Sequence, residues 1–179
     1  MGGEFAKKVE DVGVRYVRIM PEEDDPTSAI GRSWKSTFIA QTKEEAESKM
    51  QELGTTWKWL EDGNVRTETA TIPAIRTDDR TGMKTFFNSM VAAYTGWVDS
   101  RNDPKKSVCC GDGSEVNGEV LTKMAKVLEE ESAVIPWQKG DVLLIDNKPF
   151  SKSTSFGCRP FISDLLKPNK NKTQINANL

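Results

Sequence analysis

Residues 55–75 constrain the fold of this chain more than any other segment of its sequence. Two tryptophans flank Lys58, which is the alternation of a half-buried strand. Residues 61–64 read Glu-Asp-Gly-Asn, a hairpin-turn composition, and residues 65–69 return with β-branched side chains between charges. Pro73 then ends the β segment, because proline has no amide hydrogen to donate to a ladder. The segment therefore predicts an antiparallel hairpin.

Helices are predicted on both sides of this hairpin. Residues 4–12 carry apolar side chains on one side. Thr42 and Glu45 have the spacing of a capping box and begin a second helix, which Gly54 ends. Residues 119–131 are the best helix, because their apolar residues recur with a 3.6-residue period. That stripe consists of Val120, Leu121, Met124, Val127 and Leu128.

Several shorter segments complete the predicted fold. Residues 14–20 form a β-rich run, and residues 34–38 read as a short extended piece. Residues 84–94 fit either a strand followed by a loop or a buried helix. Residues 99–118 read as loop, and residues 142–147 as a buried strand ending in polar residues. Together these elements predict a mainly β, α+β fold in which two or three helices pack outside antiparallel sheets.

Composition excludes several functional classes. The 179 residues fit one domain, and 25 Lys+Arg stand against 27 Asp+Glu, so the basic excess of a phosphate-neutralising nucleic-acid binder is absent. No apolar run approaches the roughly 20 residues of a membrane span. The N-terminus lacks the apolar segment of a signal peptide. Cys109, Cys110 and Cys158 are an odd number with an adjacent pair, which indicates reduced thiols. We expect a cytoplasmic protein.

The sequence contains no histidine. Histidine is the commonest metal ligand and titrates near neutral pH without perturbation. Its absence excludes, within this chain, triads with a histidine base, zinc sites of three histidines and the iron site of two histidines and one carboxylate. Any function assigned to these residues has to be compatible with that absence.

Two groups of acidic residues each allow a functional and a structural interpretation. Residues 21–26 read Pro-Glu-Glu-Asp-Asp-Pro, which fits a solvated loop or a cluster of oxygen ligands for a hard cation. Asp141 and Asp146 flank the predicted strand at 142–147, and two carboxylates can perform acid–base chemistry. The simpler interpretation is that Asp141 closes the turn after Gly140 and Asp146 caps the end of the strand.

Four separated segments carry a resemblance to a known family. In chain order they are residues 23–38 (EDDPTSAIGRSWKSTF), 72–75 (IPAI), 87–97 (FNSMVAAYTGW) and 137–147 (WQKGDVLLIDN). They resemble the taurine dioxygenase family of iron(II)- and 2-oxoglutarate-dependent oxygenases, most closely its plant clavaminate synthase-like branch. The match runs from about residue 4 to about residue 147.

The resemblance implies a fold and a chemistry. The family fold is a double-stranded β-helix, or jelly roll, of which residues 1–167 would form an incomplete domain, followed by a disordered tail at 168–179. Family members use iron(II) and 2-oxoglutarate to activate dioxygen and oxidise a small organic substrate. Neither nucleic acid nor membrane is an expected partner.

The same resemblance indicates that the iron ligands are missing. The family's histidine-x-Asp/Glu pair would lie upstream of residue 1. Its second histidine should follow Asn147 by a few residues, where counting forward gives Lys152 and counting back from the segment at 159–161 gives Phe156. A protonated lysine would repel iron(II), and phenylalanine has no donor atom. We therefore predict no catalytic and no metal-binding residue in this chain.

Two further positions are candidates by resemblance. Arg159 is the expected partner of the 2-oxoglutarate carboxylate, because a guanidinium binds a carboxylate in bidentate fashion. It lies closer to the lost ligand position than the family's arginine should, and the alternative is a surface arginine near the C-terminus. Asn88 and Ser89 lie in a motif that would face the family's active-site mouth. Their neighbours favour a core role, and these are Phe86, Phe87, Met90 and Val91.

Three functional hypotheses follow. The first is a partial oxygenase domain, inactive alone because every iron ligand is absent. The second is a non-catalytic domain of the same fold that binds a small molecule or a partner. The third is a truncated gene product with an altered C-terminal end, since a family-like motif gives way after Asn147 to a sequence rich in Ser, Lys and Asn.

Overall fold

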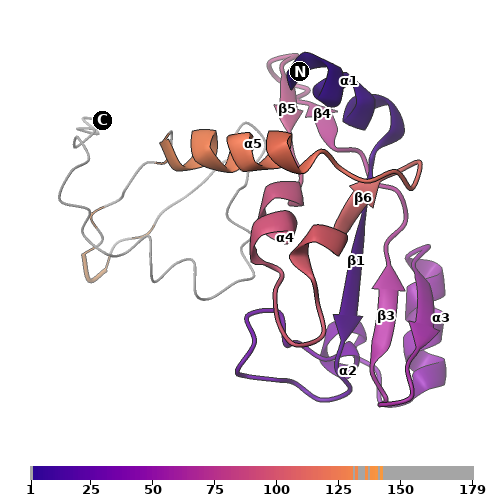
Figure 1. Cartoon of the computed structure of the whole chain (residues 1–179). Coiled ribbons are helices and arrows are strands. Elements are labelled where there is room, and N and C mark those ends of the chain that lie inside the picture. Colours follow the sequence, from indigo (N-terminus) through magenta and orange to yellow (C-terminus); the bar gives the residue numbers. More distant parts are fainter. Residues whose placement is uncertain (1, 131, 133–135, 137, 141, 143–179) are drawn as a thin grey trace.

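The computed structural model describes residues 2–130, 132, 136, 138–140 and 142 (Figure 1). Its larger sheet is antiparallel with strand order β2-β3-β1-β6, and a second sheet pairs β4 with β5. The strands are β1 (Val14–Met20), β2 (Thr56–Trp59), β3 (Val65–Glu68), β4 (Ile75–Thr77), β5 (Lys84–Phe86) and β6 (Val108–Cys110).

Helices connect and cover these strands. They are α1 (Gly2–Val12), α2 (Trp34–Phe38), α3 (Lys43–Glu52), α4 (Met90–Gly96), α5 (Gly118–Glu130) and the short 3-10 helix η1 (Pro104–Lys106). Antiparallel sheets with helices confirm the predicted α+β class, although the described residues hold five α-helices instead of two or three. The jelly roll stays a prediction.

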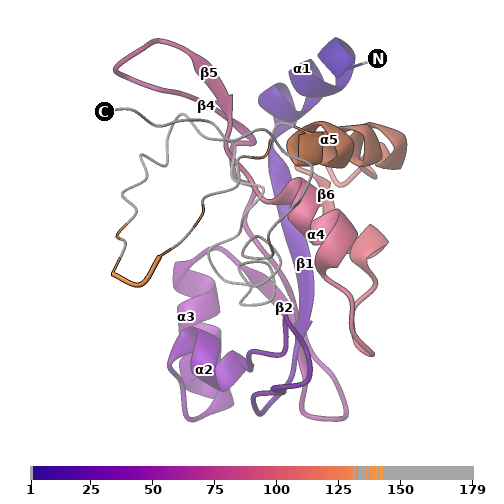
Figure 2. The ribbon, with the colours of Figure 1, turned by 90° about the vertical axis from the view of Figure 1, so that its left-hand side faces the viewer.

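Two apolar clusters pack against the larger sheet. The first gathers Val14 and Tyr16 of β1 with α1, α4 and α5, and the second gathers Met20 with α2 and α3. Figure 2 shows the two helix groups toward opposite ends of β1. Met50 and Leu121 are fully buried, and each such side chain contributes roughly 1.5–3 kcal/mol.

Helix α3 begins with the capping box that the sequence predicted. Thr42 Oγ1 accepts a hydrogen bond from the Glu45 amide at 3.3 Å, and the Glu45 carboxylate accepts from the Thr42 amide at 3.4 Å. This reciprocal pair satisfies two amide hydrogens that the first turn of α3 cannot pair internally. The capping box is confirmed.

The prediction of an extended piece at 34–38 is wrong. These residues form α2, because the Ser33 hydroxyl accepts from the Ser36 amide at 3.1 Å and caps the helix. Trp34 and Phe38, four residues apart, then face the second cluster together. Ser33 was the available signal for a helix start.

Three other segments refine the predictions. Residues 84–94 combine both alternatives, since β5 is followed by α4. Residues 99–118 contain η1 and β6 as well as loop, and β6 pairs with β1. The apolar stripe of α5 includes Leu121 at the core, but Val127 is 54% exposed and does not belong to the buried face. The predicted strand at 142–147, apart from Val142, and the tail at 168–179 lie outside the described residues.

Candidate functional site

The Asn88–Ser89 motif joins β5 to α4 beside β1. The Ser89 amide donates to the Tyr16 hydroxyl at 2.8 Å. The Asn88 side chain donates from Nδ2 to the Ala74 carbonyl and accepts at Oδ1 from the Met90 amide, both at 2.9 Å. Asn88 therefore uses its donor and its acceptor to fix the start of α4, which is a structural role.

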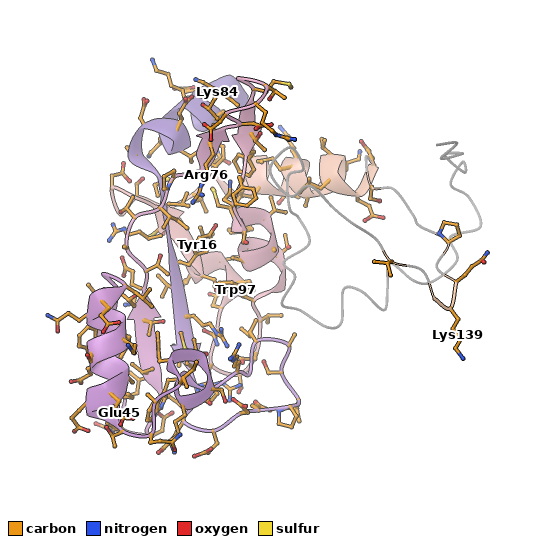
Figure 3. All side chains as sticks on the ribbon, turned by 180° about the vertical axis from the view of Figure 1, so that it is seen from behind. Tyr16, Glu45, Arg76, Lys84, Trp97 and Lys139 are labelled. Carbon is orange, nitrogen blue, oxygen red and sulfur yellow. The ribbon has the colours of Figure 1, made fainter. Side chains whose placement is uncertain are left out.

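Tyr16 is the central side chain of this junction. It is 8% exposed, and its ring lies 5.7 Å from the Trp97 ring, centroid to centroid, in a tilted arrangement (Figure 3). Burial raises the pKa of Tyr16 to about 12, against a smaller lowering effect of the Ser89 amide. The phenol is therefore neutral at physiological pH. It can donate a hydrogen bond but is poorly matched to a general base.

The apolar neighbours of the motif behave as the core interpretation predicted. Met90 and Val91 are buried in the first cluster. Phe86 is partly buried and packs against the same cluster, whereas the Phe87 ring lies beneath the Arg76 guanidinium, 5.4 Å from its centroid. The neighbours of Asn88 and Ser89 thus serve mainly the packing of the first cluster.

A second polar cluster holds the loop that follows β1. Arg101 Nη2 lies 2.7 Å from Asp25 Oδ2 and 2.8 Å from Asp99 Oδ2. The Ser28 hydroxyl also donates to Asp99 Oδ2, at 2.9 Å. One guanidinium therefore ties residues 21–33 to the segment after α4. We call Arg101, Asp25, Asp99 and Ser28 the Arg101 cluster.

The surroundings of the Arg101 cluster favour the ionised form of its two carboxyl groups, Asp99 and Asp25. Burial raises the pKa of Asp99, but hydrogen bonds from the Arg101 amide and guanidinium, from Asn102 and from Ser28 outweigh it and hold the pKa at about 2. Hydrogen bonds from the Thr27 hydroxyl and from Arg101 lower the pKa of Asp25. Both carboxylates are ionised at neutral pH, so the guanidinium between them is paired with two negative charges.

The acidic loop at 21–26 is occupied by protein donors. Asp24 accepts from the Ser33 amide at 2.7 Å and from the Ser36 hydroxyl at 2.8 Å. Lys35 Nζ lies 3.1 Å from Glu22 and 2.5 Å from Glu23. Within the described part of the chain, no three His, Cys, Asp or Glu side chains converge as a metal site would require. These contacts favour the interpretation as a structural loop over a cation site.

The two described cysteines are unsuited to nucleophilic chemistry. Cys110 is buried in the first cluster, and Cys109 is partly buried on the opposite face of β6. Burial is the main cause that raises the pKa of Cys109. Because the thiolate is the reactive form, this thiol is a weak nucleophile at neutral pH.

The residues present do not fit an iron site of two histidines and one carboxylate. The 179 residues include no histidine, and the carboxylates of the acidic loop and of the Arg101 cluster are engaged by amides, hydroxyls and cations. The expected 2-oxoglutarate partner Arg159 lies outside the described residues. So do Asp141, Asp146, Lys152 and Phe156.

Sequence reasoning missed the two residues that organise these clusters. Tyr16 was visible only as a member of a β-rich run, and its contact with Ser89 spans 73 positions. Arg101 lay in a predicted loop, and its bond to Asp25 spans 76 positions. The run of four acidic residues at 22–25 was the sequence signal for a contact with a positively charged side chain from another part of the chain.

Comparison with known proteins gives two similarities. The chain is 50% identical over 144 residues to a clavaminate synthase-like protein of Arabidopsis thaliana, covering 80% of this chain and 44% of the relative. It is 26% identical over 170 residues to a dapdiamide synthesis protein of Enterobacter agglomerans, covering 88% of this chain and 48% of the relative. The chain thus spans less than half the length of these curated relatives. No protein-family model matches it.

These findings support the predicted resemblance to clavaminate synthase-like proteins.

The longest helix among the described residues, α5, has 13 residues. None of the described helices has the length and apolar character needed to cross a bilayer.

Proposed function

We propose that this chain is part of an iron(II)- and 2-oxoglutarate-dependent oxygenase of the taurine dioxygenase family, in its clavaminate synthase-like branch. The observation that carries the proposal is the 50% identity over 144 residues to a protein named clavaminate synthase-like. Four family-like segments in the expected order support it, as do antiparallel sheets covered by helices. In the family, the cofactors activate dioxygen to oxidise a small organic substrate.

We further propose that residues 1–179 alone do not perform this reaction. The family's iron site needs two imidazoles, and this sequence has none. What the chain contributes is a scaffold of two sheets, with Tyr16 as a neutral hydrogen-bond donor beside Trp97. Iron(II) and 2-oxoglutarate are cofactors of the family, and the ligands that hold the metal would have to come from outside these residues.

An anaerobic titration tests the proposal. Iron(II) and 2-oxoglutarate bound together in such a site give a weak metal-to-ligand band in the visible spectrum. The purified chain should give no band, while a full-length oxygenase of the family, titrated in parallel, should give one. A band from this chain would contradict the proposed lack of iron ligands.

A second candidate function is non-catalytic binding of a small molecule or partner. The Tyr16 hydroxyl beside the Trp97 ring favours it, because a neutral hydroxyl and an aromatic ring suit binding without supplying a base near neutral pH. Thermal melting with and without small organic acids separates the two. A binder should melt at higher temperature with its ligand, and an unliganded scaffold should not respond.

A further inference from the structure

Among the described residues, β4 and β5 form a two-stranded sheet by themselves, so that the outer edge of each strand is unpaired there. In the described part of the chain, the only strand partner of β5 is β4. Figure 2 shows the hairpin extending away from the larger sheet, with its turn clear of the described helices. Two strands alone are marginally stable in water, and an open edge can accept a further strand.

The backbone groups that would accept such a strand can be assigned from the register. The Asp78 amide donates to the Met83 carbonyl at 2.9 Å, so this pair is hydrogen-bonded across the hairpin. In an antiparallel ladder hydrogen-bonded and non-hydrogen-bonded pairs alternate. Thr77–Lys84 and Ile75–Phe86 are therefore non-hydrogen-bonded pairs. The amides and carbonyls of Lys84 and Phe86 consequently point outward from β5.

The two faces of the hairpin differ in what they contact. Ile75 and Phe86 pack on the first cluster, and Lys84 Nζ pairs with Glu10 of α1 at 2.5 Å. The opposite face carries Arg76 and Thr85, which are directly paired across the strands. One face is thus fixed to the body of the protein, while no cluster of the described residues covers the other.

Arg76 stands apart from the other described arginines. Those others donate to carboxylate or carbonyl oxygens within the protein. Arg76 is exposed, and its Cζ lies 5.4 Å from the centroid of the Phe87 ring. No carboxylate of the described residues forms an ion pair with it. Since Phe87 directly follows β5, this contact draws the guanidinium across the hairpin toward the β5 edge. A ring contact of this kind holds the cation without using its N–H groups, and none of these is hydrogen-bonded to another described residue.

We propose that the outer edge of β5 binds an extended acidic peptide segment of a partner protein as an added strand. The Lys84 and Phe86 backbone groups would pair with the peptide backbone, which supplies affinity in this mode of recognition. A peptide carboxylate on the open face would pair with Arg76, which supplies selectivity for acidic sequences. The proposal stands on the hairpin alone and does not depend on the oxygenase assignment.

Binding of a synthetic probe tests this inference. The probe is a short capped peptide of alternating glutamate and threonine, titrated against the 179-residue chain by calorimetry and by amide chemical shifts. We expect saturable binding with shifts concentrated at residues 84–87. Arg76→Glu should weaken binding about tenfold, because it replaces an attraction by a repulsion. Lys58→Glu, which reverses an exposed cation on β2, should leave the affinity unchanged and serves as the matched control.

Two further peptides complete the test. A version with lysine in place of glutamate should bind at least about tenfold more weakly. An N-methylated version, which cannot pair along the edge, should not bind. Absence of binding, equal binding of the lysine or N-methylated peptide, or an equal effect of Lys58→Glu would overturn the proposal. Self-association through β5, detected by sedimentation of the chain alone, would identify a second copy as the occupant and would equally overturn it.

Discussion

Removing the charge of Asp99 should destabilise the fold in a pH-dependent manner. The Asp99 side chain is 8% exposed and accepts hydrogen bonds from Arg101, Asn102 and Ser28. These contacts bring its pKa from 3.8 to about 2. A pKa shift of one unit corresponds to about 1.4 kcal/mol, so the lowered pKa of Asp99 corresponds to about 2 kcal/mol of folding free energy.

The sign of the effect follows from the lowered pKa. Stability from the Asp99 carboxylate is complete above its unfolded pKa near 4 and is lost as the pH falls toward about 2. Asp99→Asn should therefore unfold with about 2 kcal/mol less free energy than the parent at pH 7, and the gap should narrow between pH 4 and pH 2. In the variant, Arg101 still has Asp25 as a partner at 2.7 Å.

Urea unfolding followed by tryptophan fluorescence at pH 7, 4 and 3 measures this difference. Glu61→Gln is the control, because it removes a carboxylate from an exposed turn position. Its free energy of unfolding should change by less than about 0.5 kcal/mol. An Asp99→Asn variant as stable as the parent at pH 7, or a deficit that does not shrink with acid, would refute the electrostatic argument.

Three further predictions concern single contacts and use the same unfolding assay. Thr42→Ala removes the hydroxyl that accepts from the Glu45 amide and should cost about 1 kcal/mol; no loss would show that the capping box is not stabilising. Tyr16→Phe leaves the Ser89 amide without its hydroxyl acceptor and should cost about 1–3 kcal/mol, and an unchanged stability would contradict the role of that bond. Met50→Ala empties a fully buried position in the second cluster and should cost about 2–5 kcal/mol; a loss below 1 kcal/mol would mean that the cluster is loosely packed.

Local patterns predicted much of the fold correctly. The capping box at Thr42 and Glu45, the hairpin at 55–69 and the helix at 119–131 all depend on residues close together in sequence. Short-range physics sets such elements, because caps, turns and apolar periods act within a few positions. Composition alone likewise revealed the absence of imidazole.

Long-range contacts account for what the sequence did not reveal. β6 is only three residues long and exists as a strand because it pairs with β1, about 90 positions away. Tyr16 meets Ser89 and Arg101 meets Asp25 only after the chain has folded. α2 is a different case, since Ser33 and the spacing of Trp34 and Phe38 were local signals of a helix.

Iron binding tests the central claim most directly. The purified chain would be dialysed anaerobically against iron(II) with excess 2-oxoglutarate, and the bound metal measured by elemental analysis. Because the chain has no histidine, we predict that the iron content will not exceed that of the dialysis buffer. One equivalent of tightly held iron per chain would contradict the account, since it would require a set of ligands that a chain without histidine does not provide.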